Sequence, residues 1–232
     1  MFNLEKRPQQ SRKWVYLSPF LAVVITMISG GILFAILGEN PFIAIRIIFW
    51  DPLFDPNFAS YSRPQLLVKA GPLILIAIGL SFGFKAGVWN IGAEGQYIIG
   101  AIFGASVALA FFPMESKFIF PLMIITGALG GFLWAMIPAL LKAKLNTNEI
   151  LVSLMLVYVA ESILASVSQG LLKNPDGYGF PGSRNLQKYE SAANLEIISN
   201  SGMHWGVLFA FITVIFSYIV LTRHIQGFNI QL

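Results

Sequence analysis

Residues 118–141 read FIFPLMIITGALGGFLWAMIPALL and contain no charged side chain. The hydrocarbon core of a bilayer, roughly 30 Å thick, is crossed by a helix of about 20 mostly apolar residues, so this run is long enough to span it. Five further stretches have the same character: 18–38, 66–84, 96–112, 150–171 and 205–222. The sequence therefore predicts an all-α protein, a polytopic transmembrane helix bundle with about six spans.

The composition of the whole chain agrees with this fold class. Hydrophobic residues make up 56% of the 232 residues and charged residues only 11%, against roughly 25% charged residues in a soluble protein. A chain this apolar cannot cover a core with polar surface, which excludes soluble globular, disordered and coiled-coil proteins. The 15 Lys and Arg residues are spread along the chain, so nucleic-acid binding is not expected.

Charge counting predicts the orientation of the bundle. If the N-terminus is cytoplasmic, the cytoplasmic pieces hold eight basic and three acidic residues, whereas the outer pieces hold seven of each. Basic residues concentrate in cytoplasmic loops of membrane proteins, so we expect a cytoplasmic N-terminus. Residues 1–17 then form a cytoplasmic tail, and 18–232 form the transmembrane domain. The first span is expected to be an uncleaved anchor, because its apolar run is too long for a signal peptide.

The apolar piece 42–50 is too short to cross the membrane. It carries Arg46 and is followed by Asp51, Pro52, Asp55 and Pro56. We therefore expect an interfacial helix that lies against membrane lipid.

Small residues recur at four-residue spacing in two of the expected spans. Gly100, Gly104 and Ala108 mark the third span, and Gly127 and Gly131 begin a similar row in the fourth. Such rows let helix backbones approach closely in lipid. They predict a tightly packed bundle.

Residues 85–96, KAGVWNIGAEGQ, interrupt an otherwise apolar region with three glycines, two amides and an acid. Irregular backbone near membrane depth is tolerated where it lines a cavity or is covered by protein, and transporters place solute sites at broken helices. The stretch is therefore either a site for a polar solute or an ordinary cytoplasmic turn. The residues alone favour neither.

Glu161 lies near the middle of the span 150–171. A charge at that depth costs roughly 2.5–3.5 kcal/mol on insertion scales, so it is expected to face a partner or a water-filled path. Helical spacing places Tyr158, Ser168 and Gln169 on the same side. The stripe is either part of a translocation path or a structural, hydrogen-bonded glutamate.

Nothing in the sequence predicts catalysis or a bound cofactor. The chain has no cysteine, His204 and His224 have no ligand cluster near them, and no phosphate-binding G-x-x-x-x-G-K-[ST] motif occurs. We therefore expect no enzyme activity, no metal site and no cofactor.

The run WNIGAEGQ at 89–96, preceded by FKAG at 84–87, resembles the signature of permease subunits of bacterial ABC importers. This class transports simple sugars, branched-chain amino acids and nucleosides. The residues of the run are most similar to those of the nucleoside uptake group. A second match, LLKAKLNTNEI at 140–150 followed by SLML at 153–156, is similar to the basic loop and following helix of the family. The resemblance covers about residue 66 to the end, and these permeases usually continue into further helices. It therefore implies a chain that is incomplete at the C-terminus.

The resemblance implies a non-catalytic pore subunit in a bacterial cell (inner) membrane. A cytoplasmic ATPase subunit would drive it, a second permease subunit would complete the path, and an extracytoplasmic solute-binding lipoprotein would deliver solute. Nucleosides are the expected solute, and simple sugars are the alternative. On this interpretation the residues expected to contact the solute or to control the conformation are Asn90, Glu94, Gln96, Trp89, Tyr158 and Glu161. A rival interpretation is an ion-coupled secondary transporter that uses Glu161 as its relay.

Overall fold

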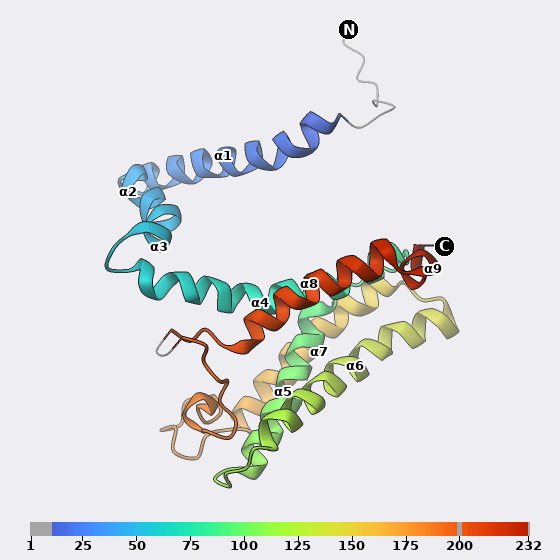
Figure 1. The fold of residues 1–232 in the computed structure, drawn as a ribbon. Helices are drawn as coiled ribbons and strands as arrows, with labels where there is room; N and C mark the ends of the chain where they lie inside the picture. The colour runs from blue at the N-terminus through green and yellow to red at the C-terminus, as the bar shows by residue number, and fades with distance from the viewer. Residues whose placement is uncertain (1–10, 199–200, 232) are drawn as a thin grey trace. The chain divides into compact units, whose positions relative to one another are not determined.

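The computed structural model describes residues 11–198 and 201–231, and this part of the chain is helical without a β-strand (Figure 1). It contains six helices that are long and apolar enough to cross a membrane, which confirms the predicted all-α class. These helices are α1 (Arg12–Ile36), α4 (Ala59–Lys85), α5 (Ala93–Phe111), α6 (Ile119–Leu145), α7 (Glu149–Gln169) and α8 (Trp205–Arg223). Residues 1–10 of the expected cytoplasmic tail lie outside the described part, and the N-terminal orientation stays a prediction.

Several helices extend past the apolar runs from which they were predicted. Helix α1 begins at Arg12 rather than at residue 18, and α4 begins at Ala59 rather than at residue 66. Polar residues such as Arg63 are compatible with a helix that continues beyond the hydrocarbon core. Hydropathy therefore locates the part of a span that lies in lipid and misses its polar ends.

The link between α6 and α7 is only three residues long, 146–148. One of its residues caps the C-terminus of α6, and another caps the N-terminus of α7. Asn146 ends α6 in a left-handed conformation (φ 50°), and its N–H donates to the Lys142 carbonyl. Asn148 begins α7, and its Oδ1 accepts from the N–H groups of Ile150 and Leu151 at 3.0 and 3.3 Å.

The chain divides after Leu66 into two compact units. In the first unit, α2 (Pro41–Ile45), a π-helix η1 (Arg46–Trp50) and α3 (Asp51–Phe54) follow α1. A helix is therefore present at the predicted residues 42–50 and continues to Phe54, whereas its interfacial position stays a prediction. Pro52 does not end it, because it occupies the first turn of α3, where a missing N–H costs no hydrogen bond.

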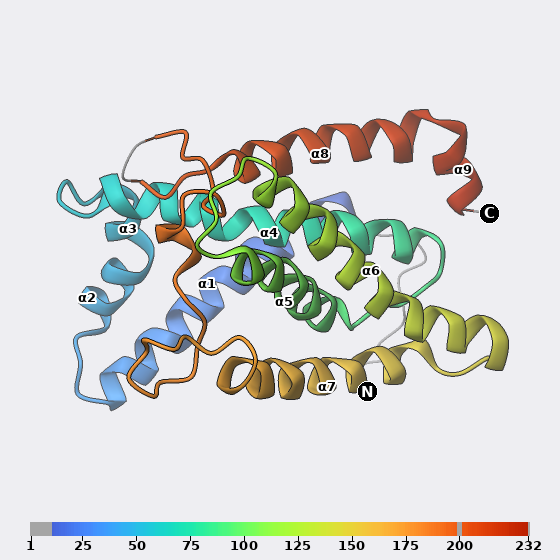
Figure 2. The same cartoon turned by 90° about the horizontal axis from the view of Figure 1, so that it is seen from below.

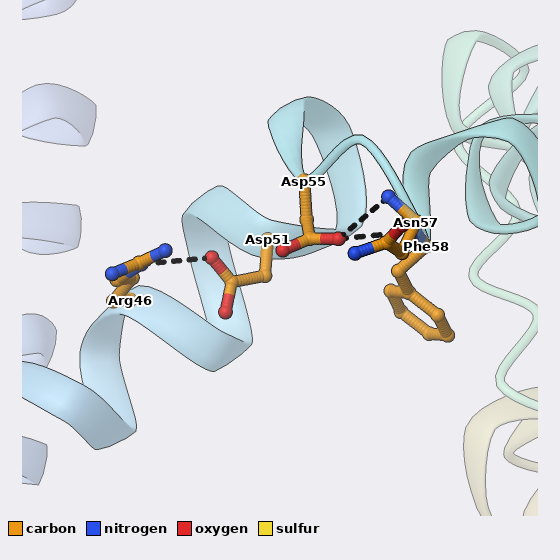
Figure 3. Close-up of polar contacts among 5 residues, drawn as sticks. All are labelled: Arg46, Asp51, Asp55, Asn57 and Phe58. Atoms are coloured by element: carbon orange, nitrogen blue, oxygen red, sulfur yellow. Dashed lines mark hydrogen bonds and ion pairs between the residues drawn. The ribbon is translucent and has the colours of Figure 1, made fainter.

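Two groups of polar contacts stabilise this segment, one along its helical part and one just after it (Figure 3). Arg46 Nε lies 3.0 Å from Asp51 Oδ1 along the helical segment. Asp55 Oδ1 accepts from the N–H groups of Asn57 and Phe58 at 2.9 and 3.1 Å, just before α4 begins. Aromatic and aliphatic side chains of the segment remain exposed, and α1 and α4 on either side are both candidate spans. This placement supports the interfacial interpretation.

In the second unit, α5 packs against α6 and α7 (Figures 1 and 2). A Cβ atom added to Gly100 would lie 2.9 Å from the Gly127 carbonyl oxygen, and one added to Gly104 would lie 3.1 Å from that of Met123. The backbones of α5 and α6 are thus in direct contact. The predicted row of small residues is confirmed as a packing surface.

The two ends of this unit are closed by different connections. At one end the α5–α6 turn meets the long α7–α8 connection, which contains the short helix η2 (Leu186–Lys188). At the other end the α4–α5 link meets the start of α7. Helix α9 (Ile225–Gln231) follows α8. Successive connections thus lie at opposite ends of the unit, as antiparallel membrane spans require.

Candidate solute-binding site

The irregular backbone predicted for 85–96 is confined to residues 86–92, which link α4 to α5. Gly87 has a φ of +74°, a left-handed conformation that favours glycine and turns the chain away from α4. Asn90 Oδ1 accepts the Gly92 N–H at 2.8 Å and so shapes the approach to α5. Because α5 begins at Ala93, Glu94 and Gln96 lie on its first turn rather than in a loop.

Ser153 of α7 fixes the link in place. Its side chain is buried (residue exposure 2%), and its Oγ accepts the Ile91 N–H at 3.2 Å while donating to the Ile150 carbonyl at 3.1 Å. A Cβ atom on Gly92 would lie 2.9 Å from both Cβ and the carbonyl oxygen of Ser153. The two stretches that carry the resemblance, 89–96 and 153–156, are therefore in contact. Ser153 was not predicted as a site residue, although it stands in the second stretch.

Ser153→Ala is expected to destabilise the protein by about 0.5–1.5 kcal/mol, because it removes the part-buried hydrogen bond between the Ile91 N–H and the Ser153 hydroxyl. Thermal unfolding of the purified protein in detergent measures the effect. Ser162→Ala is the matched control, since Ser162 is exposed on the same helix and its hydroxyl donates to the Tyr158 carbonyl of that helix. Equal stability of the two variants would show that Ser153 does not hold the link.

Three cavities lie along α4, α5 and α6. The link cavity, about 430 Å³, lies beside residues 88–90; the middle cavity has about 390 Å³; the loop cavity, about 780 Å³, reaches the α7–α8 connection. The link and middle cavities share Gly79, Leu80, Asn90, Gln96 and Ala135. The middle and loop cavities share Gln96, Tyr97, Gly127 and Ala128. They therefore follow one another along the α5–α6 face from one end of the unit toward the other.

The structure brings three of the six predicted site residues to these cavities. Gln96 lines all three, Asn90 lines the link and middle cavities, and Trp89 lines the link cavity. Tyr97 lines the middle and loop cavities beside Gln96.

The other three predicted residues, Glu94, Tyr158 and Glu161, are exposed and line none of these cavities. Within the described part of the chain, the Glu161 carboxylate makes no hydrogen bond or ion pair. The roles assigned to these three residues stay predictions.

An ion pair lies in the lining of the link cavity. Lys142 Nζ of α6 lies 3.0 Å from Glu149 Oε2, and Glu149 stands in the first turn of α7, where the helix dipole favours a carboxylate. Both side chains line the link cavity. This pairing was not predicted, because the short α6–α7 link that brings the two residues together is not evident from charge alone. No group of three or more His, Cys, Asp or Glu side chains suited to a metal occurs among the described residues.

Residues 63–231 match the family described as branched-chain amino acid transport system / permease component. The chain belongs to this family. Together with the six apolar helices, membership identifies a multi-pass membrane protein. No solved structure gives a significant match to the chain.

Curated relatives of this permease carry different solute names. A glucose ABC transporter permease protein of Haloferax volcanii is 31% identical over 93% of the chain. A nucleoside ABC transporter permease protein of Lactococcus lactis is 28% identical and a guanosine ABC transporter permease protein of Bacillus subtilis 25% identical, each over 93% of the chain. The chain spans 57%, 59% and 60% of the length of the glucose, nucleoside and guanosine permeases, respectively.

Proposed function

We propose that the chain forms part of the translocation path of an ATP-driven importer for a small polar solute, with nucleosides as the first candidate. The observation that carries the proposal is the position of Gln96, which lines three successive cavities along the α5–α6 face. An amide can both donate and accept hydrogen bonds, as a hydroxylated solute or a nucleobase edge requires. The cavities, at about 390–780 Å³, lie within the usual size range of ligand sites.

Aromatic side chains beside this amide are compatible with nucleosides as the first candidate. Trp89 faces the link cavity, and Tyr97 faces the middle and loop cavities. Flat aromatic faces stack on nucleobases with a favourable free energy of about 1–3 kcal/mol per base. A simple sugar is the alternative, because sugars also bind to aromatic faces and amides and because one relative is named a glucose permease.

ATP hydrolysis is assigned to a separate cytoplasmic subunit. The chain contains no phosphate-binding loop, and the relatives are named as permease proteins of ABC transporters. A second permease subunit and an extracytoplasmic solute-binding protein complete the proposed complex. The N-terminus is placed in the cytoplasm, which puts the α4–α5 and α6–α7 links on the side of the ATPase.

Uptake of a radiolabelled nucleoside, in cells that carry the full-length permease and its partner subunits, tests the proposal. We expect uptake to disappear when the ATPase partner carries a substitution that abolishes ATP hydrolysis. Unlabelled nucleosides should compete, whereas competition by glucose alone would correct the solute to a sugar and keep the mechanism.

Glu161→Gln separates this importer from an ion-coupled transporter. Because Glu161 lines none of the three cavities, we expect the variant to retain uptake. Uptake that survives the inactive ATPase, collapses with the proton gradient and is lost in Glu161→Gln would replace the proposal with an ion-coupled mechanism.

A further inference from the structure

The loop cavity differs from the other two in being lined in part by the connection between α7 and α8. Small residues of α5 and α6, among them Gly100, Gly104 and Gly127, form what we call its floor. The α7–α8 connection, which we call its cover, contributes the exposed residues Gln187 and Asn194. We propose that this cavity is a second solute subsite, in which Gln187 and Asn194 bind an uncharged, hydroxylated solute opposite Gln96. The inference rests on the proposed function and adds residues and a solute class to it.

Tyr189 anchors the cover to the end of α5 and α6. Its exposure is only 6%, its hydroxyl donates to the Met114 carbonyl, and its ring packs edge-on against Phe112 with centroids 5.3 Å apart. Tyr189 also belongs to a buried cluster with Ala108 and Ile119 of the two helices. The segment that carries Gln187 and Asn194 is therefore attached to the same helices that form the cavity floor.

Polar contacts on both sides of Tyr189 fix the backbone of this segment. Ser191 Oγ accepts the Ser116 N–H of the α5–α6 turn at 2.9 Å. Before Tyr189, Asn185 Oδ1 accepts the Gln187 N–H at 3.0 Å and begins η2. Arg184 places its guanidinium 4.5 Å above the Phe112 ring. The backbone at Gln187 is thereby fixed before any solute binds, which lowers the entropic cost of binding.

The chemistry of the lining indicates the class of solute. The described residues that line the loop cavity include three amides, Gln96, Gln187 and Asn194, the phenol of Tyr97, and no charged side chain. Amides and a phenol can hydrogen-bond to hydroxyl groups and base edges. The described residues of the lining offer a phosphate or carboxylate no cationic side chain to pair with. The cavity therefore fits a nucleoside or a sugar and disfavours a nucleotide, a sugar phosphate or an amino acid.

Solute protection of introduced thiols tests this subsite. Residues 1–232 contain no cysteine, and the labelling of each variant is measured relative to the same complex without an introduced thiol. Gln187→Cys and Asn194→Cys are made separately in the full-length permease complex, and a maleimide is added to isolated membranes with both faces accessible. We expect uridine or adenosine at millimolar concentration to slow labelling of both variants at least threefold. The corresponding 5′-monophosphates should leave the labelling rate unchanged.

Lys188→Cys is the matched control, since Lys188 is exposed on the same short helix and does not line the cavity. Its labelling rate should not change with solute. Equal protection at Lys188→Cys, equal protection by nucleosides and nucleotides, or no protection by a nucleoside or by glucose at either cavity position would each overturn the inference.

Concentration dependence of uptake gives a second readout for the case in which a cysteine variant fails to fold. Asn194→Ala and Gln187→Ala are expected to raise the half-saturating solute concentration about tenfold with little change in the maximal rate, because they weaken binding before the rate-limiting step. Unchanged half-saturation in both variants would overturn the subsite while leaving ATPase-dependent uptake intact. Absence of ATPase-dependent uptake in the wild-type complex would instead refute the proposed function.

Discussion

Gly100→Leu is expected to prevent α5 and α6 from packing. The nearest atom to a Cβ at this position is the Gly127 carbonyl oxygen at 2.9 Å, and Gly127 in turn would place its own Cβ 3.1 Å from the Gly100 carbonyl oxygen. Neither atom is the end of a flexible side chain, so a larger residue must push the helix backbones apart. We expect a destabilisation of about 3 kcal/mol or more, at the upper end of the range for overpacked positions.

Thermal unfolding and size-exclusion chromatography in detergent measure this loss. Gly30→Leu in α1 is the matched control, because a Cβ at Gly30 has no neighbour within 4 Å. Gly100→Ala provides a graded test: alanine favours a helix over glycine by about 1 kcal/mol, so any net destabilisation must come from the contact with α6. A Gly100→Ala variant more stable than the wild type would contradict the direct backbone contact.

Gln96→Leu is expected to reduce solute uptake about 10- to 100-fold while expression and folding persist. Leucine keeps much of the volume of glutamine but cannot hydrogen-bond, so each solute group bound by the amide would lose its partner at a cost of about 1–3 kcal/mol. Because Gln96 lines all three cavities, the loss applies at each stage of passage. The measurement is the initial rate of radiolabelled uptake per molecule of permease in the membrane.

Two comparisons make this prediction specific. Gln169→Leu removes the same group at the exposed end of α7, away from the three cavities, and should leave uptake unchanged. Glu94→Ala alters an exposed residue on the same turn as Gln96. If Glu94→Ala abolishes uptake while Gln96→Leu has little effect, solute does not pass along the α5–α6 face.

The spans were predictable because a run such as 118–141 contains no charge over a length that matches the bilayer. The close approach of α5 and α6 was predictable from the spacing of Gly100, Gly104, Gly127 and Gly131, since only small residues permit it. Helix ends were less predictable, because polar residues can continue a helix outside the lipid. The start of α4 at Ala59 is an example.

The candidate site was only partly predictable. Asn90 and Gln96 stand out because amides are rare among apolar neighbours, whereas Gln187 and Asn194 lie in a long polar connection where amides are common. Their approach to α5 depends on the burial of Tyr189 against the α5–α6 turn, which no local pattern encodes. Ser153 was missed for the same reason, since its partner Ile91 lies in a distant part of the sequence.

The absence of side chains between the facing glycines of α5 and α6 limits how this pair of helices can move. A carbonyl group of one helix contacts a glycine of the opposite helix without a gap. Neither helix can therefore slide by a fraction of a turn without a steric clash. In the proposed transport cycle we therefore expect the two helices to move together as one rigid body. A change in the angle between this pair and α4 would act on the 86–92 link, between Gly87 in its left-handed conformation and Ile91, which Ser153 holds.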